Sequence, residues 1–320
     1  GEGELSGDFD RLLVTHLLRV PDEVRLSGQI ADLLGTPRID LRGDWDDIGL
    51  QITDANTLAV RAGQLALTGG LDEYRLELAT QLAIDGVPEV SLAAQASGNL
   101  EELLAERIEL NSAFGSLKGQ ARAGFSPLSL DGDFAARDWN PEALVDGWPG
   151  SLGFQLGFEA DGDGNVSVRI SELRGSLREL PVAGAARLRR TGERLSVEDA
   201  ELRVGDNRLS ARLVSTPELD GRFDLDASDL SALWPGLNGS ATGSGRVSGT
   251  PDRPALAAQL AVANLVYQGQ AIDSFELRAA IDPEQRVDLR LQAAGISSGE
   301  LALGDLELTV FGATDAYELD

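Results

Sequence analysis

Apolar and polar residues alternate along most of this chain, and the alternation limits the possible folds more than any other feature. In residues 74–84 the large apolar side chains have even numbers, whereas Arg75 and Glu77 have odd numbers. A period of two places the two sets on opposite faces of a β-sheet. Further short stretches, such as residues 195–197 and 202–204, are separated by residues typical of tight turns. The sequence therefore predicts an all-β protein with roughly 20 to 25 strands, more than one ordinary open sheet contains.

One β-unit is repeated within the chain. Its clearest copy covers residues 219–281, and weaker copies of its opening start near positions 5, 71 and 130. Residues 5–37 align without a gap on residues 219–251, so that Gly35-Thr36-Pro37 coincides with Gly249-Thr250-Pro251. No low-complexity linker interrupts the series. We therefore expect one continuous domain over residues 1–320, as a fragment of a longer protein.

The number and spacing of the strands favour an elongated, curled antiparallel sheet or half-pipe with an apolar inner face. The irregular spacing of the repeat starts argues against short-period solenoids such as β-helices. A few one-turn helices are expected, because Asn140-Pro141 is a typical helix start and residues 228–233 are turn-like. Residues 99–106 are the best helix candidate, as a capped turn or two. A β-sandwich with an aliphatic core stays open as an alternative.

The apolar face holds few large side chains that could fill it. The chain contains 37 Gly but only 9 Phe, 3 Tyr and 4 Trp. A packed sandwich would use more aromatic rings to reach across its core, so we expect a groove that accepts an apolar guest. The candidate lining residues of this groove are Leu76, Leu78, Leu82, Ile84, Phe154, Leu156, Phe158, Val166, Val168, Ile170, Phe223, Leu225, Leu256, Leu260, Val262, Phe275, Leu277, Val287, Leu289 and Leu291.

The charge and the residue inventory argue against several classes of function. With 53 acidic against 27 basic residues the net charge is −26, which repels phosphate backbones, so no nucleic acid is expected as a partner. There is no Cys, and His16 is the only His, so we expect no catalytic residue, metal or cofactor, and no enzyme. Residues 161–165 resemble the start of a calcium loop, but Val166 stands where the loop needs Gly, which favours a hairpin turn. The chain has no run of about 18 apolar residues that would span a membrane as a helix.

Several motifs resemble those of a known family. They are Gly132-x-Phe134, Asn140-Pro141, Trp148-Pro149-Gly150, and the turn and strand pattern of residues 230–254. In these motifs the chain resembles the TamB family of translocation and assembly module proteins, within the AsmA-like group. The resemblance implies a taco-shaped β-sheet with an apolar interior. It also implies a periplasmic segment in a Gram-negative envelope, with an inner-membrane anchor outside these residues.

The resemblance implies a function and partners as well. Such proteins are described as moving phospholipid between the inner and outer membranes along an apolar groove, and as supporting the assembly of outer-membrane proteins such as autotransporters. The implied partners are phospholipid or other acyl chains and a TamA-type outer-membrane barrel of the Omp85 class, the latter through a region outside this fragment. The alternative is a chaperone-like scaffold that assists barrel insertion through its sheet edges with TamA, without conducting lipid.

Overall fold

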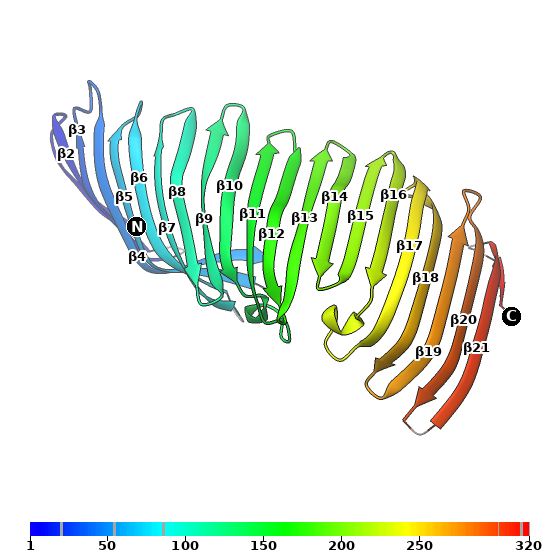
Figure 1. Ribbon diagram of the computed structural model, residues 1–320. Helices are drawn as coiled ribbons and strands as arrows, with labels where there is room; N and C mark the ends of the chain where they lie inside the picture. Colours follow the sequence, from blue (N-terminus) through cyan, green and yellow to red (C-terminus); the bar gives the residue numbers. More distant parts are fainter. Residues whose placement is uncertain (20–21, 54–55, 85–86, 300, 314–315, 320) are drawn as a thin grey trace. The chain divides into compact units, whose positions relative to one another are not determined.

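The computed structural model describes residues 1–19, 22–53, 56–84, 87–299, 301–313 and 316–319, and nearly all of them lie in strands (Figure 1). The chain divides into two compact units, Gly1–Gly162 and Asp163–Asp320. Within each unit the strands are antiparallel, which confirms the predicted all-β fold class. The number of domains stays a prediction.

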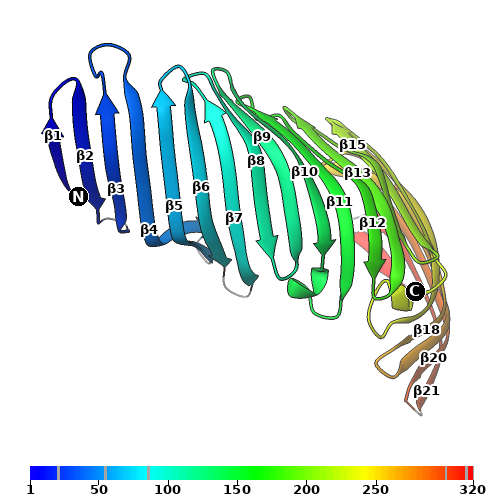
Figure 2. The ribbon, with the colours of Figure 1, turned by 60° about the vertical axis from the view of Figure 1, so that its left-hand side comes forward.

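The first unit is a meander in which each strand pairs with the next one along the chain. Figure 2 shows that its strands curve along their length. One turn of 3₁₀ helix, η1 (Pro141–Ala143), lies between its last two strands. The strands are β1 (Glu2–Gly7), β2 (Arg11–Leu18), β3 (Val24–Ala31), β4 (Arg38–Thr53), β5 (Asn56–Gly70), β6 (Tyr74–Ile84), β7 (Val87–Gly98), β8 (Glu102–Ser112), β9 (Gly115–Phe125), β10 (Leu128–Trp139) and β11 (Gly150–Asp161).

The second unit repeats this design, again with pairing only between chain neighbours in its described residues. Its 3₁₀ turn, η2 (Leu230–Ala232), lies between β16 and β17. The strands are β12 (Val166–Leu177), β13 (Leu180–Thr191), β14 (Arg194–Val204), β15 (Asn207–Thr216), β16 (Glu218–Ala227), β17 (Asn238–Thr250), β18 (Arg253–Tyr267), β19 (Gln270–Ile281), β20 (Arg286–Ser298), β21 (Leu301–Ala313) and β22 (Ala316–Leu319).

Several strands contain a β-bulge at a residue with a left-handed backbone. In β14 the register with β15 shifts between Val197 and Ala200, and Asp199 between them has φ of 49°. Ala62 in β5 and Glu172 in β12 occupy equivalent places at register shifts, with φ of 47° and 53°. A bulge inserts one unpaired residue and bends the strand without ending it. The expected separate strands at 195–197 and 202–204 are therefore one bulged strand.

The local predictions outside the strands had mixed outcomes. The two one-turn helices are confirmed, and Asn140 and Asp229 cap them by accepting hydrogen bonds from the backbone N–H two residues ahead. The predicted helix over residues 99–106 is wrong. The Asn99 side chain does accept bonds from the N–H groups of Glu101 and Glu102, at 2.7 and 2.9 Å, but this closes a hairpin turn, and β8 starts at Glu102.

Candidate functional site

One face of the first unit is apolar across its strands, and the strand register shows how the side chains align. Neighbouring strands lie about 4.8 Å apart, so residues in register form continuous stripes across the sheet. One row runs from β3 to β11 through Leu26, Gly43, Leu65, Leu78, Ala94, Ile108, Gly119, Phe134 and Leu156. A second row contains Leu41, Leu67, Leu76, Ala96, Ala105, Ala121, Gly132 and Phe158.

The second unit has an apolar face of the same construction. Its longest row runs from β12 to β21 through Leu173, Gly184, Leu202, Leu209, Leu225, Gly243, Leu260, Leu277, Leu291 and Leu308. Flanking rows contain Phe223, Gly245, Ala258, Ala279, Leu289 and Val310 on one side, and Ala227, Ala241, Val262, Phe275, Ala293 and Leu306 on the other. No charged residue interrupts these three rows.

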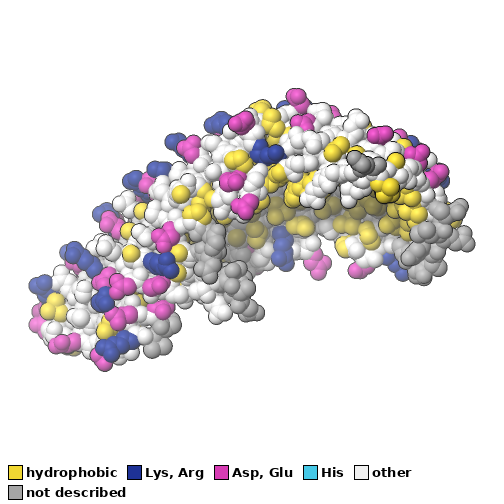
Figure 3. Space-filling view, turned by 90° about the horizontal axis from the view of Figure 1, so that it is seen from below, with side chains coloured by type: hydrophobic (Ala, Val, Ile, Leu, Met, Phe, Trp, Pro, Cys, Tyr) yellow, Lys and Arg dark blue, Asp and Glu magenta, His cyan; other side chains and the backbone are white. Residues whose placement is uncertain are grey.

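These apolar faces are only partly covered by protein. Phe223 is 38% exposed and Leu209 is 40% exposed, although both stand in the rows of the second unit. Among the described residues no large side chain is completely buried. Figure 3 shows hydrophobic side chains lining a hollow towards the right of the view, with charged side chains mainly on the outer surface. Extended apolar surface of this kind is typical of ligand-binding grooves and of surfaces that contact another protein or a membrane.

Aromatic rings lie flat along the apolar face because glycines on the next strand leave room for them. A Cβ added to Gly119 would lie 2.7 Å from Cδ1 of Phe134, and one added to Gly132 would lie 2.9 Å from Cε1 of Phe158. Gly63 is covered in the same way by the Trp45 indole. Rings in this orientation cover the surface of the sheet and do not project into the space above it. They do not reach across to an opposite wall as they would in a sandwich core.

Gly63→Ala is expected to destabilise the protein by about 1–3 kcal/mol, the usual cost of an overpacked contact. The new methyl group overlaps the Trp45 ring, whose Nε1–H donates to the Val60 carbonyl at 3.1 Å. Urea unfolding followed by circular dichroism measures the change. Gly49→Ala is the matched control, because its Cβ would meet only Thr57 Cγ2, at an ordinary 3.7 Å. Equal effects of the two substitutions would contradict the packing of Trp45 on Gly63.

The segment at η2 packs into a buried apolar core of the second unit. Leu230 is buried with Ala227 and Ala241, and apolar side chains of β16 and β18 pack against them. The Asn207 side chain holds the start of this segment, since it donates to the Asp229 carbonyl at 2.7 Å and accepts from the Asp229 N–H at 3.0 Å. Arg178 donates to the Ser231 carbonyl on the same segment. This core fixes one border of the apolar face.

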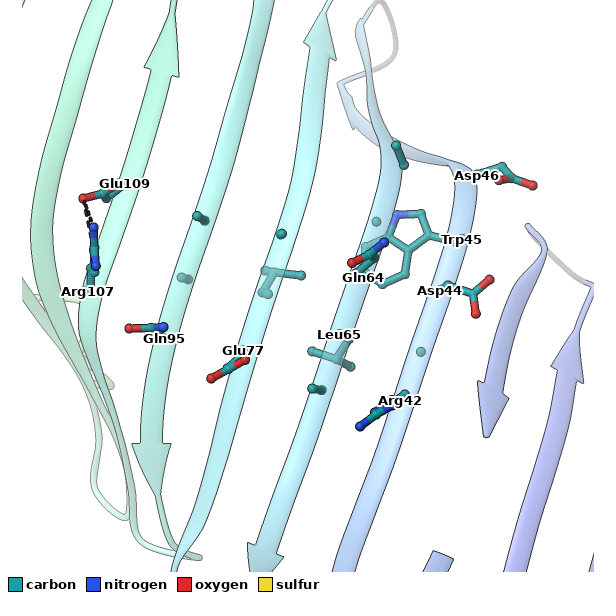
Figure 4. A pocket seen from close by; sticks show the side chains of 18 residues that line it. Arg42, Asp44, Trp45, Asp46, Gln64, Leu65, Glu77, Gln95, Arg107 and Glu109 are labelled. Carbon is teal, nitrogen blue, oxygen red and sulfur yellow. Dashed lines mark hydrogen bonds and ion pairs between the residues drawn. The ribbon is translucent and has the colours of Figure 1, made fainter. Parts of the chain in front are cut away.

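The opposite face of each sheet is polar and carries depressions of its own. In the first unit a depression of about 1020 Å³ crosses β4 to β8, with Arg42, Asp44, Gln64 and Glu77 in its lining (Figure 4). At its other side, hydrogen bonds from Arg107 and then Lys118 lower the pKa of Glu109. Apart from the half-buried Glu109, the charged side chains named here are exposed, and this lining is unlike that of the apolar face.

The structure places the sequence-predicted groove residues as follows. In the first unit Leu76, Leu78, Leu82, Phe154, Leu156 and Phe158 share the apolar face, and the Ile84 side chain lies outside the described part of the chain. In the second unit the residues from β16 to β20 fall in the rows above or in the neighbouring row of Leu213, Gly221, Val247, Leu256, Ile281 and Val287. Val168 lies opposite Leu188, which lies opposite Val197, and Val197 in turn lies opposite Leu213 of that neighbouring row. Val166 and Ile170 are two residues before and after Val168 and therefore share its face of β12.

Other members of the rows were not among the predicted groove residues. Leu65, Ile108, Phe134, Leu202 and Leu209 stand in register with predicted ones. Their alternation with polar neighbours is visible in the sequence for Leu65 and Leu209. Ile108, Phe134 and Leu202 also have charged neighbours in the sequence, but the row that each joins becomes assignable only from the strand register.

In the described part of the chain, no group of three or more His, Asp or Glu side chains is placed to hold a metal ion. Over the same residues no helix is long and apolar enough to cross a membrane.

Comparison with known proteins shows which family and which relatives this chain is similar to. The family described as "TamB, N-terminal domain" matches residues 2–320. A curated relative, the "Translocation and assembly module subunit TamB" of Haemophilus influenzae, is 28% identical over 280 residues, which is 84% of this chain and 21% of the relative. The chain thus spans about a fifth of that relative's length. No solved structure matches. With a family match along almost its whole length, the chain belongs to the TamB family.

Proposed function

We propose that this chain is a periplasmic part of an envelope-spanning TamB-like protein and that its apolar face conducts phospholipid between the inner and outer membranes. The observation that carries the proposal is the set of uninterrupted apolar rows that cross each unit while remaining partly exposed. An acyl chain gains about 0.8 kcal/mol for each methylene group removed from water. A row of Leu, Ala and Gly offers that gain at every strand.

Family membership supports a wider role in the envelope. We propose that the protein supports outer-membrane protein assembly, autotransporters included, together with a TamA-type barrel that it contacts outside this fragment. An inner-membrane anchor is likewise proposed outside these residues. The role is not enzymatic, and the ligands are phospholipid or other acyl chains.

The proposal is tested by placing a photo-crosslinking amino acid at position 277 or position 276 of the full-length protein in cells. Leu277 stands in the longest row between Leu260 and Leu291, whereas Glu276 is its neighbour on the polar face. After irradiation, phospholipid covalently attached to the protein is measured by mass spectrometry. We expect lipid adducts at position 277 and at most background at 276. Equal adducts at both positions would contradict conduction along the apolar face.

The second candidate is the scaffold that assists barrel insertion through sheet edges without conducting lipid. An added strand would pair with the edge of a sheet, and in the described residues β1 pairs with β2 alone. A crosslinker at Leu5 in β1 discriminates between the candidates. Nascent outer-membrane barrels captured at Leu5, with no lipid at 277, would favour the scaffold.

A further inference from the structure

Five arginines gather on the polar face of the second unit, in a chain whose net charge is −26. Arg212 on β15 lies directly opposite Arg222 on β16, which in turn lies directly opposite Arg246 on β17. Two strands further along, Arg278 on β19 lies opposite Arg290 on β20. All five side chains are exposed. We call these five residues the arginine patch.

The first three arginines are placed unfavourably for an isolated protein. Directly opposite residues have Cβ atoms about 5 Å apart, and like charges at that separation destabilise a sheet. Arg278 and Arg290 are relieved by Glu276 and Asp288 on their own strands, at 3.8 and 3.2 Å. By contrast, no carboxylate of the described residues forms an ion pair with Arg212, Arg222 or Arg246. With no ion pair of their own, these three adjacent guanidinium groups keep donors free for an external anion.

The surface between the arginines is hollowed. A depression of about 690 Å³ is bordered by Arg222 and Arg246 on one side and by Arg278 and Arg290 on the other. Its lining also contains Asp224 and Asp288, so that four arginines face two carboxylates. The remaining lining consists of small residues, mainly alanines of β18 and β19, with a polar pair in which Gln259 Nε2 donates to Ser244 Oγ at 3.1 Å. β17 and β19 are two strand spacings apart, about 10 Å. Guanidinium groups can therefore approach one tetrahedral anion from both sides.

We propose that the arginine patch binds a phosphate-bearing anion, that is, a phosphate monoester or diester. A guanidinium fork matches two phosphate oxygens, and a phosphate has enough oxygens to engage arginines from opposite sides. The patch lies on the face opposite the apolar rows, since Gln259 of the depression alternates along β18 with Leu260 of the longest row. The site is thus independent of lipid conduction along the apolar face.

The proposal is tested by titration calorimetry on the full-length protein with inorganic phosphate, with glycerol 3-phosphate, and with vesicles of phosphatidylglycerol against phosphatidylcholine. We expect saturable binding that weakens as salt is added and falls at least about tenfold in the double variant R222Q/R246Q. Binding of the soluble probes identifies a free phosphate ligand, and binding of the anionic vesicles alone identifies a lipid headgroup. The matched control is R75Q/R122Q, which removes two exposed arginines from the first unit, each at 3.9–4.0 Å from a carboxylate. Equal losses in the two double variants, or no saturable binding of any probe, would overturn the proposal.

Thermal unfolding gives a second readout that a structural role of Arg222 would not produce. In phosphate-free buffer Arg222→Gln should leave the unfolding temperature unchanged or raise it, because it removes repulsion from both neighbours. Added phosphate should raise the unfolding temperature of the parent protein, as any ligand of the folded state does, and raise that of the variant less. A variant that melts lower without phosphate and keeps the full phosphate effect would count against the site.

Discussion

Lysine in place of Leu291 is expected to remove bound phospholipid from the second unit and to stop lipid transfer, whereas lysine in place of Gln292 should change neither. Leu291 stands in the longest apolar row, directly opposite Leu277 and Leu308. An ammonium group there must lose water before an acyl chain can pass, at a cost of several kcal/mol. A barrier of that size lowers the transfer rate by at least about tenfold.

The control for Leu291→Lys is Gln292→Lys, which places the same charge on the opposite face of β20. Gln292 is the next residue and lies on the polar face, where its side chain donates to Glu307 at 3.2 Å, so its replacement by lysine adds the same charge without touching the row. Leu291 lies outside the buried core at η2, and circular dichroism checks that both variants fold. Bound lipid is quantified by mass spectrometry and transfer by exchange of labelled phospholipid between membranes. Normal transfer by a folded Leu291→Lys protein would exclude the apolar rows as the route.

Asn207→Ala is expected to lower the free energy of unfolding by about 2–4 kcal/mol, because the backbone N–H and carbonyl of Asp229 both lose the buried Asn207 side chain as their partner. Asn207 is 2% exposed, so water cannot replace the amide. The loss is a large share of the roughly 5–15 kcal/mol that stabilises an ordinary domain. Urea unfolding measures it.

Two further variants identify the cause of the loss at Asn207. Asn207→Asp keeps the acceptor for the Asp229 N–H but lacks the donor to its carbonyl, so its effect should be intermediate. Asn238→Ala, at an exposed position, should change stability by less than about 0.5 kcal/mol. If Asn207→Ala behaved like Asn238→Ala, the Asn207 amide would not be what anchors the segment at η2.

The sequence was sufficient to predict the fold class and much of the apolar face, because both depend on the period of two. Phe223, Leu225 and Leu277 could be assigned to one face because each alternates with charged neighbours over several residues. The helix prediction for residues 99–106 was wrong because an Asn cap gives the same local signal at a hairpin turn and at the start of a helix. Only the pairing of β8 with both of its neighbours decides between them.

The bulges explain why the rest of the face was missed. In β12 the apolar positions are even up to Ile170 and odd from Leu173 onward, with the left-handed Glu172 between them. This change from even-numbered to odd-numbered apolar positions is visible in the sequence, but the end of one strand and the start of another would produce the same pattern. Any of several residues could take the left-handed conformation, and the choice depends on the partner strand. The flat aromatic rings are a similar case, since Gly245 and Phe223 become neighbours only through the register of β16 and β17.

The neighbour-to-neighbour pairing within each unit has a consequence for how such a protein folds and how it changes in length. Every described contact between strands closes a short loop of chain, so a hairpin can form locally and add to the growing sheet without waiting for a distant segment. Stability then accumulates as a sum of contacts between adjacent strands, as in repeat proteins. Insertion or loss of one hairpin preserves the direction of every later strand and the side on which its leucines stand. Evolution can therefore adjust the reach of such a sheet two strands at a time while its cross-section stays the same.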